Sequence, residues 1–308
     1  MCRLNPKIDL VFKKIFAAEQ NKNVLISLIN SILPEEEQIV EVTIKNPYND
    51  KDFVNDKLSI VDIKATDERG RWYDIELQVK KQTYYGKRAI FYHSEIYGNQ
   101  LKEGQSYDKL RKTIIISILD FEYFTKDKRY FRRCSYKDFD TNEFYHELDF
   151  ADLYFVELGK FDNELKNIKT TLERWITFLN NASYYDNENL PDELKSPEIM
   201  QAITTIETMS LNEREREYYE SAKKVMRDRM AIMQTAIEDA KKEALAEGME
   251  KGIEKGMEKG IYETAKNGII GGLSNEVIKL MTKLNDQQID KIRFELTKND
   301  KLKKIEGL

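Results

Sequence analysis

Cysteine and histidine are scarce in this sequence, which has two of each among 308 residues. Cys2 and Cys134 lie far apart, so they form neither the spacing of a metal site nor a disulfide framework, and they fit a reducing compartment. With only His93 and His146 beside them, a zinc site is not expected. The scarcity therefore argues against zinc enzymes, zinc fingers and disulfide-stapled secreted domains.

Long apolar runs and an excess of positive charge are also missing. No apolar run approaches the roughly 20 residues that span a bilayer, and the N-terminus MCRLNPKIDLVF lacks the core of a signal peptide. We therefore expect a soluble cytoplasmic protein with no membrane contact. Charged residues make up 34 % of the chain, but the net charge is −5. Because proteins that coat nucleic acid are normally basic overall, any contact with nucleic acid must come from a local patch.

Residues 57–80, KLSIVDIKATDERGRWYDIELQVK, alternate polar and apolar side chains on both sides of a turn, as a β-hairpin does. Residues 68–70 suit a three-residue loop that ends in a glycine with positive φ. Counting back from this loop places Asp62 opposite Glu76 on one face of the hairpin. A two-residue loop would instead put the two acids on opposite faces.

Two acids in such a cross-strand pair have Cβ atoms about 4.5–5.5 Å apart, and like charges at that distance are destabilising. A divalent cation between Asp62 and Glu76 would offset the repulsion, and Mg²⁺ is typically held by one or two carboxylates together with waters and phosphates. The alternative is an exposed hairpin face whose acids point into water or meet Lys64 and Lys80. The spacing leaves both interpretations open.

The rest of the N-terminal half mixes helices and strands. Apolar periodicity and turn residues predict two helices within 4–33, a strand at 39–45, a helix at 84–102, and strands at 113–119 and 152–158. A mixed sheet with helices on its faces is the natural α/β solution for this order of elements. We therefore expect an α/β fold for residues 1–158.

Two segments are basic although the chain as a whole is acidic. Residues 80–112 and 122–137 carry an excess of Lys and Arg, and the second interleaves them with aromatic residues. Basic and aromatic side chains together suit a phosphate backbone and unstacked bases, so we expect DNA contacts here. The alternative for the second segment is a solvated hairpin whose aromatic rings pack on the sheet. The candidate DNA-binding residues are Lys87, Arg88, Tyr92, Arg132 and Arg133.

The C-terminal half is predicted to be all-α. Residues 159–211 form a helical extension, and residues 212–266 form one long helix with a heptad seam at 226–244 that pairs with another helix. Glycine then recurs every four residues over 248–260, where we expect backbones to approach closely; the alternative is a flexible charged linker. Residues 267–308 are predicted to be a small helical interaction module. We therefore expect a homo-oligomer joined through the C-terminal helices.

Several short motifs between residues 4 and 121 occur in an order and at spacings that are typical of one nuclease family. They are IDLVFKKIF, which includes Asp9; SIVDIKATD, which includes Asp62; YDIELQV, which includes Glu76 and Gln78; Arg88 and Tyr92 on the next helix; and EGQSYDKL. In this combination the sequence resembles the Rpn family of recombination-promoting nucleases, which are also described as transposases of the PD-(D/E)XK nuclease superfamily. The helical tail with its glycine repeat is similar to that family as well.

The resemblance implies a restriction-endonuclease-like core over residues 1–158 that cleaves DNA phosphodiester bonds with Mg²⁺, or alternatively with Mn²⁺. Carried over by position, Asp62 and Glu76 bind the metal, and Asp9 adds a further acidic ligand. Gln78 stands where the superfamily motif has lysine, and an amide can orient water but brings no positive charge. Lys80, on the same face, is the candidate for that charge, and the alternative is that metal and amide suffice. The expected catalytic residues are Asp62, Glu76, Gln78 and Lys80.

The implied function is a metal-dependent DNA endonuclease that acts in recombination, mobile-element processing or defence against foreign DNA. The alternative is a catalytically weak or inactive nuclease-fold protein that binds or regulates DNA and assembles through its C-terminal helices. Gln78 and the acidic overall charge motivate this alternative.

Overall fold

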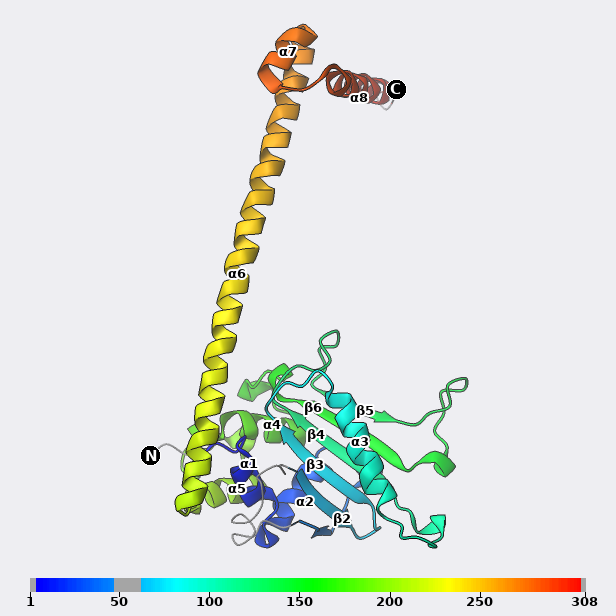
Figure 1. The fold of residues 1–308 in the computed structure, drawn as a ribbon, viewed down its shortest axis with the longest axis vertical. Coiled ribbons are helices and arrows are strands. Elements are labelled where there is room, and N and C mark those ends of the chain that lie inside the picture. The colour runs from blue at the N-terminus through cyan, green and yellow to red at the C-terminus, as the bar shows by residue number, and fades with distance from the viewer. Residues whose placement is uncertain (1–3, 47–61, 306–308) are drawn as a thin grey trace. The chain divides into compact units, whose positions relative to one another are not determined.

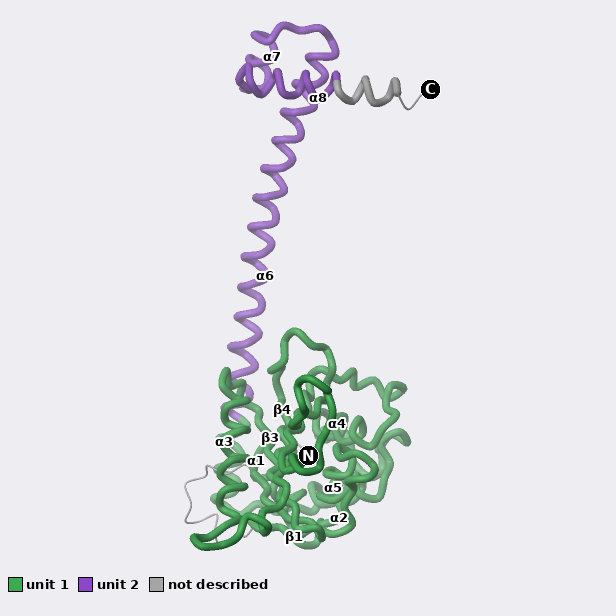
Figure 2. Tube along the Cα trace, turned by 90° about the vertical axis from the view of Figure 1, so that its right-hand side faces the viewer, with its two compact units in different colours: residues 1–223 green, residues 224–308 purple. Residues whose placement is uncertain are grey.

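The computed structural model describes residues 4–46 and 62–305, with side chains as far as residue 297. The chain forms two compact units, Met1–Lys223 and Lys224–Leu308, which we call unit 1 and unit 2 (Figure 2). The finer divisions expected from the sequence, at residues 158, 211 and 266, stay predictions.

Unit 1 contains a six-stranded mixed sheet in the order β1-β2-β3-β4-β6-β5 (Figure 1). Its middle strands β3, β4 and β6 run parallel, and every other neighbouring pair is antiparallel. The sheet confirms the expected α/β fold class. The strands are β1 (Val42–Ile44), β2 (Asp62–Asp67), β3 (Trp72–Gln78), β4 (Thr113–Leu119), β5 (Phe131–Ser135) and β6 (Ala151–Glu157).

Helices cover both faces of this sheet. Figure 2 shows α3 on one side of β3 and β4, and α2, α4 and α5 on the other. On its side, α3 buries Tyr85, Ala89 and Ile96 against apolar side chains of β4 and β6. The helices are α1 (Asp9–Phe16), α2 (Lys22–Asn30), α3 (Tyr85–Gly98), α4 (Thr171–Asn181), α5 (Pro197–Thr208), α6 (Glu213–Ile270), α7 (Asn275–Thr282) and α8 (Asp286–Ile305).

The hairpin register is the predicted one, with Asp62 paired to Glu76. Gly70 has a φ of +77°, a conformation that glycine adopts without the clash a Cβ would cause. The Gly70 N–H donates to the Asp67 carbonyl oxygen at 3.0 Å, which closes the loop. The part of the predicted hairpin at 57–61 lies outside the described residues.

One prediction about strands needs correction, because the strand expected at 39–45 is confined to the three residues of β1. The strand β5 lies within 122–137, where a hairpin with aromatic rings packed on the sheet was the alternative to a DNA-contacting segment. The Phe131 ring of β5 does stack on Tyr154 of β6. Arg132 of β5 faces inward and is buried, whereas Cys134, two residues on, is exposed at the edge of the sheet. The run at 113–119, by contrast, is the fully buried central strand that its continuous apolar sequence predicted.

Unit 2 contains most of α6, together with α7 and α8. Its small core consists of Ala265 on α6, Ile278 on α7, and Ile289 and Ile292 on α8. This arrangement gives the predicted long helix followed by a small helical module. Within residues 4–46 and 62–305, no helix combines the length and the apolar composition that a membrane span requires.

Candidate active site

The predicted acids gather on the sheet face that α3 covers. Because side chains alternate along a strand, Asp74, Glu76 and Gln78 of β3 share this face with Asp62 and Lys64 of β2. Asp62 lies directly opposite Glu76, and Lys64 lies opposite Asp74. The hairpin therefore brings three carboxylates together from two adjacent strands, with Asp62 and Asp74 as diagonal neighbours.

Glu76 is buried and held by two side chains of α3. Arg88 Nη2 donates to Glu76 Oε1 at 2.5 Å, and the Tyr85 hydroxyl donates to Glu76 Oε2 at 3.0 Å. Burial raises the pKa of Glu76 and outweighs the opposite effects of the Arg88 charge and the Tyr85 hydrogen bond. The α3 contacts therefore fix the direction of this carboxylate but leave its negative charge incompletely compensated.

Asp74 is the buried acid that the sequence prediction missed. It is 1 % exposed, and its Oδ1 atom makes no hydrogen bond. Burial, followed by the negative charge of Asp62, raises its pKa to about 7. Buried carboxyl oxygens without a partner are uncommon, since losing hydration is costly. In the sequence Asp74 was one more polar position of an alternating strand, so no local signal distinguished it.

Of the two lysines considered as partners of these acids, only Lys64 contacts one of them among the described residues. Lys64 Nζ lies 3.5 Å from Asp62 Oδ2, so part of the hairpin face does pair with a lysine. Gln78 Nε2 donates to the carbonyl oxygen of Lys80 at 3.1 Å, and the Lys80 side chain is exposed. Gln78 thus contacts the backbone of Lys80, not its amino group.

Helix α1 contributes another acid, Asp9, and another lysine, Lys13, to the surroundings of Asp62. Asp9 Oδ2 accepts a hydrogen bond from the Tyr218 hydroxyl at 3.4 Å, and burial raises the pKa of Asp9. Lys13 follows one helical turn later; burial lowers its pKa, although the charges of Asp62 and Asp9 oppose this. Lys13 was part of the motif IDLVFKKIF but was not among the predicted catalytic residues. Its spacing of four from Asp9 is the signal that could have found it.

The arginines of β5 lie elsewhere. Arg132 donates to Glu157 Oε2 at 3.3 Å and is buried. Arg133 Nη2 donates to Asp152 Oδ2 at 2.8 Å and to Glu37 Oε1 at 2.7 Å. These contacts hold the two guanidinium groups against acids of the fold, so we do not include them in the DNA surface proposed below.

The DNA-binding candidates of α3, by contrast, lie beside the carboxylates. Arg88 contacts Glu76 directly, and its guanidinium carbon is 5.1 Å from the centre of the Tyr92 ring. Lys87 is exposed on the same helix. The helix thus joins the acidic cluster to a basic and aromatic surface.

The acidic cluster contains the type of ligand that a divalent cation prefers. Asp62, Asp74 and Glu76 offer carboxylate oxygens, the ligands that hard cations prefer. The unpartnered Asp74 Oδ1 and the raised pKa values of Asp74 and Glu76 indicate a surplus of buried negative charge that a cation would offset. In the described part of the chain, however, no three His, Cys, Asp or Glu side chains already converge as metal ligands. Lys64 and Arg88 supply the nearby positive charge in this structure.

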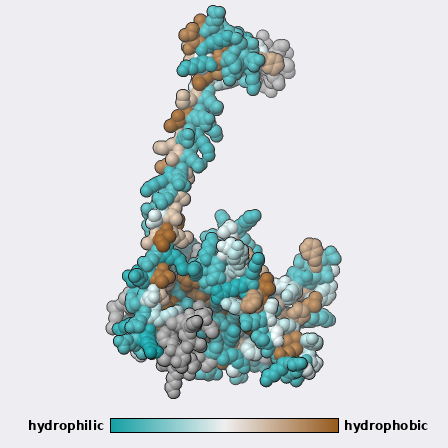
Figure 3. All heavy atoms as spheres, viewed as in Figure 1, coloured by the Kyte–Doolittle hydropathy of each residue, from teal (hydrophilic) through white to brown (hydrophobic). Residues whose placement is uncertain are grey.

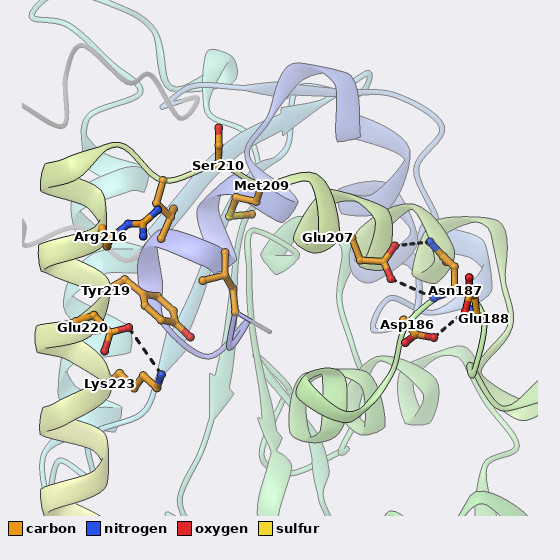
Figure 4. A pocket seen from close by; sticks show the side chains of 12 residues that line it. Asp186, Asn187, Glu188, Glu207, Met209, Ser210, Arg216, Tyr219, Glu220 and Lys223 are labelled. Carbon is orange, nitrogen blue, oxygen red and sulfur yellow. Dashed lines mark hydrogen bonds and ion pairs between the residues drawn. The ribbon is translucent and has the colours of Figure 1, made fainter. Parts of the chain in front are cut away.

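Unit 1 has a further groove of about 760 Å³, away from the predicted site residues. Figure 4 shows side chains of the first turns of α6, including Arg216 and Tyr219, across from Asn187 and Glu207. Asn187 Nδ2 donates to Glu207 Oε2 at 3.1 Å. None of the predicted catalytic or DNA-binding residues lines this groove, and we assign no function to it.

Comparison with protein families gives one match. A model of the PD-(D/E)XK nuclease family transposases matches residues 6–236, which is 231 of the 308 residues and includes every carboxylate of the cluster. The chain belongs to this family. No curated protein and no solved structure matches it. The suspected assignment is thereby confirmed, and most of unit 2 lies beyond the matched region.

Membership of the PD-(D/E)XK nuclease family assigns the chain a nuclease-like or transposase-like function with DNA as the implied substrate. Nucleases of this superfamily generally use divalent metal ions. The family name itself records the motif, an aspartate followed by Asp or Glu, any residue and Lys. The residues carried over from the resemblance, Asp62, Glu76 and Gln78, all lie within the matched region.

Proposed function

We propose that this family member is a metal-dependent DNA endonuclease that acts in recombination, mobile-element processing or defence against foreign DNA. One observation carries the proposal. Asp62 and Glu76 lie opposite each other on the hairpin, and the neighbouring Asp74 is buried with an unpartnered carboxyl oxygen. A sheet face that brings three acids together, two of them buried, with incomplete compensation, is suited to a cation and a phosphate.

Asp62, Asp74 and Glu76 would hold the ion, with Mg²⁺ as the first choice and Mn²⁺ as the alternative. When bound, the ion polarises the scissile phosphate and lowers the pKa of water. Arg88 and Tyr85 keep the Glu76 carboxylate in one orientation through their two hydrogen bonds. Preorganised charge of this kind needs no rearrangement when the phosphate becomes more negative in the transition state.

The remaining roles concern the residues around Gln78. Its amide can orient water by hydrogen bonding, whereas the positive charge that the motif lysine would bring must come from elsewhere. We assign that charge to Lys13, because it interacts electrostatically with Asp62 and its pKa is lowered by burial, which makes it a better proton donor. Asp9, one turn before it, favours the charged form of Lys13. Lys80 stays the alternative source of charge.

Plasmid nicking in Mg²⁺ tests the proposal. We expect Asp62→Asn and Glu76→Gln each to reduce the nicking rate at least 100-fold, since each removes one metal-ligating charge while keeping the shape of the side chain. Asp140→Asn, which changes an exposed acid of a distant loop, should nick like the wild type. Equal rates in all four proteins would remove Asp62 and Glu76 from the mechanism.

The alternative function is a DNA-binding or regulatory protein that keeps the nuclease fold without its activity. Two observations favour it. Gln78 replaces the motif lysine, and both oxygens of Glu76 already accept hydrogen bonds. A full-length chain that binds DNA but leaves the plasmid intact in both Mg²⁺ and Mn²⁺ would support this alternative.

We also propose that unit 2 joins copies of the chain. Large apolar side chains of the predicted seam, among them Met230, Met233 and Ile237, are exposed along α6, and Figure 3 shows apolar positions recurring along this helix. A Cβ added at any glycine from Gly248 to Gly260 would meet no atom within 4 Å, so no contact among the described residues explains the glycine repeat. A second copy packed along this helix would explain both features.

Sedimentation of the full-length chain tests this assembly. We expect Met230→Gln with Met233→Gln to lower the sedimenting mass toward that of a monomer, because polar side chains weaken a seam. Lys242→Gln, which lies opposite the seam in the heptad, is the matched control. A wild type that is already monomeric at high concentration would contradict the proposal.

A further inference from the structure

We propose that the exposed face of α3 is a stacking surface for unpaired DNA bases, so that the chain prefers a substrate with a single-stranded segment. This inference rests on the proposed function for its biological meaning. The stacking surface consists of Tyr84, Lys87, Arg88 and Phe91. Its binding to DNA can be measured whether or not the chain cleaves.

Aromatic rings are unusually exposed on this helix. Tyr84 is 71 % exposed and Phe91 is 63 % exposed, and Ile90 beside them is 57 % exposed. Tyr84 directly precedes α3, and Phe91 lies two helical turns into the helix, so both exposed rings belong to its N-terminal part. Figure 3 shows apolar surface among hydrophilic surface on the side of unit 1 where α3 runs in Figure 1. Exposed aromatic rings that gather in this way usually contact a ligand or partner.

Positive charge accompanies the rings. Residues 80–94 contain four Lys or Arg and no Asp or Glu. Lys87 Nζ lies 5.4 Å from the centre of the Tyr84 ring. Cations that track a backbone, combined with rings that stack on bases, are how proteins bind single strands without reading sequence. The surface therefore combines the positive charge and the exposed rings that an unpaired strand would contact.

The stacking surface is joined to the acidic cluster. Arg88 contacts Glu76 at 2.5 Å and also lies over the Tyr92 ring, whose centre is 6.0 Å from that of Phe91. A strand whose bases stack along α3 would thus keep a phosphate close to the carboxylates. Duplex DNA cannot use the rings in this way, because its bases are already stacked on one another.

A second copy of the chain is a poorer occupant for this surface. A stable interface buries about 800 Å² and some 20–30 residues on each partner, whereas the exposed apolar part here consists of Tyr84, Ile90 and Phe91. Two copies would also bring the same positive segment against itself. Charge and size therefore both favour a nucleic acid strand.

Fluorescence anisotropy with the full-length protein in EDTA, where metal-dependent cleavage is blocked, tests the inference. The probes are a labelled single strand, the duplex of the same sequence and an abasic strand of the same length. We expect the single strand to bind at least tenfold more tightly than either of the others. Tyr84→Ala with Phe91→Ala should weaken single-strand binding by about 5-fold or more for each ring. The same double variant should change duplex and abasic binding less than twofold.

Tyr184→Ala removes another exposed ring of unit 1 and should change nothing. Phe91→Trp should keep the affinity, because the larger ring still stacks. Equal losses for single strand, duplex and abasic strand would overturn the inference, as would undiminished binding by the double alanine variant. A fall in sedimenting mass without loss of DNA affinity would also overturn it, and would show that the surface binds protein. Because no cleavage is involved, a chain that fails to nick plasmid can still pass or fail this test.

Discussion

Two buried acids of the central sheet, one on each face, have different surroundings. On the face away from α3, Asp152 is 0 % exposed and meets Lys112 at 2.7 Å and Arg133 at 2.8 Å. Burial alone would raise the pKa of Asp152, but the hydrogen bonds from these two cations lower it below its ordinary value. On the α3 face, Asp74 is just as buried, and its pKa is raised to about 7.

The comparison distinguishes an acid whose charge is satisfied by contacts within the fold from an acid whose charge is not. A buried carboxylate is stable when cations and hydrogen bonds satisfy it, as around Asp152. One carboxyl oxygen of Asp74, by contrast, makes no hydrogen bond, although lysine and arginine are abundant in the chain. An arrangement that leaves this charge surplus on one face only is expected of a site that binds a cation.

The largest expected effect contrasts the loss of one acid from each face of the sheet, Asp152 and Asp62. Asp152→Asn should destabilise unit 1 by about 3–5 kcal/mol, because it leaves the buried Lys112 and the half-buried Arg133 beside an amide. Asp62→Asn should change the stability by no more than about 1 kcal/mol, because its contact with the half-exposed Lys64 resembles a surface ion pair. Urea unfolding of both variants measures the difference. Equal losses would mean that both faces use their acids structurally.

The pH dependence of stability sharpens the comparison at Asp74. Its folded pKa, about 7, lies above the ordinary value of 3.8, so its contribution to stability is fully present below about pH 4 and is lost as the pH rises through 7. Asp74→Asn should therefore gain about 2 kcal/mol of stability at pH 8, and the gain should disappear near pH 4. Thermal unfolding in EDTA across this range provides the measurement. A gain that is the same at pH 4 and pH 8 would show that Asp74 carries no titrating charge penalty.

A smaller effect concerns Lys13, the lysine that we propose compensates for Gln78. Lys13→Met should slow nicking about tenfold, and adding Gln78→Lys should recover most of that loss by restoring charge on the same face. Lys80→Met serves as the comparison and should change the rate less than threefold. If Lys80→Met is the slower variant, the exposed lysine supplies the charge and our assignment of Lys13 is wrong.

The carboxylate pair was predictable from sequence because its geometry is local. The loop that ends at Gly70 sets the register, and alternation then determines that Asp62 faces Glu76. The buried strand at 113–119 was predictable for a similar reason, since its composition alone identifies it. The family resemblance was predictable from short motifs between residues 4 and 121, which lie almost entirely within the region that the family model matches.

The contacts that the sequence did not reveal depend on partners far away in the chain. Arg132 and Arg133 were part of an exposed basic segment in the sequence, yet Glu157 and Asp152 lie 25 and 19 residues later and engage them across neighbouring strands. Nothing near Asp74 in sequence reveals that one of its oxygens is buried without a partner, because that follows from how α3 and β4 cover the strand. Such information exists only after the sheet has formed.

Calorimetric titration of the metal-free, full-length chain with Mn²⁺ tests the central claim most directly. We predict one binding event in the wild type and in Asp140→Asn, its loss in Glu76→Gln, and at least tenfold weaker binding in Asp74→Asn. The same heat in all four proteins, or no heat in the wild type, would contradict the claim that the α3 face of the sheet is a cation site.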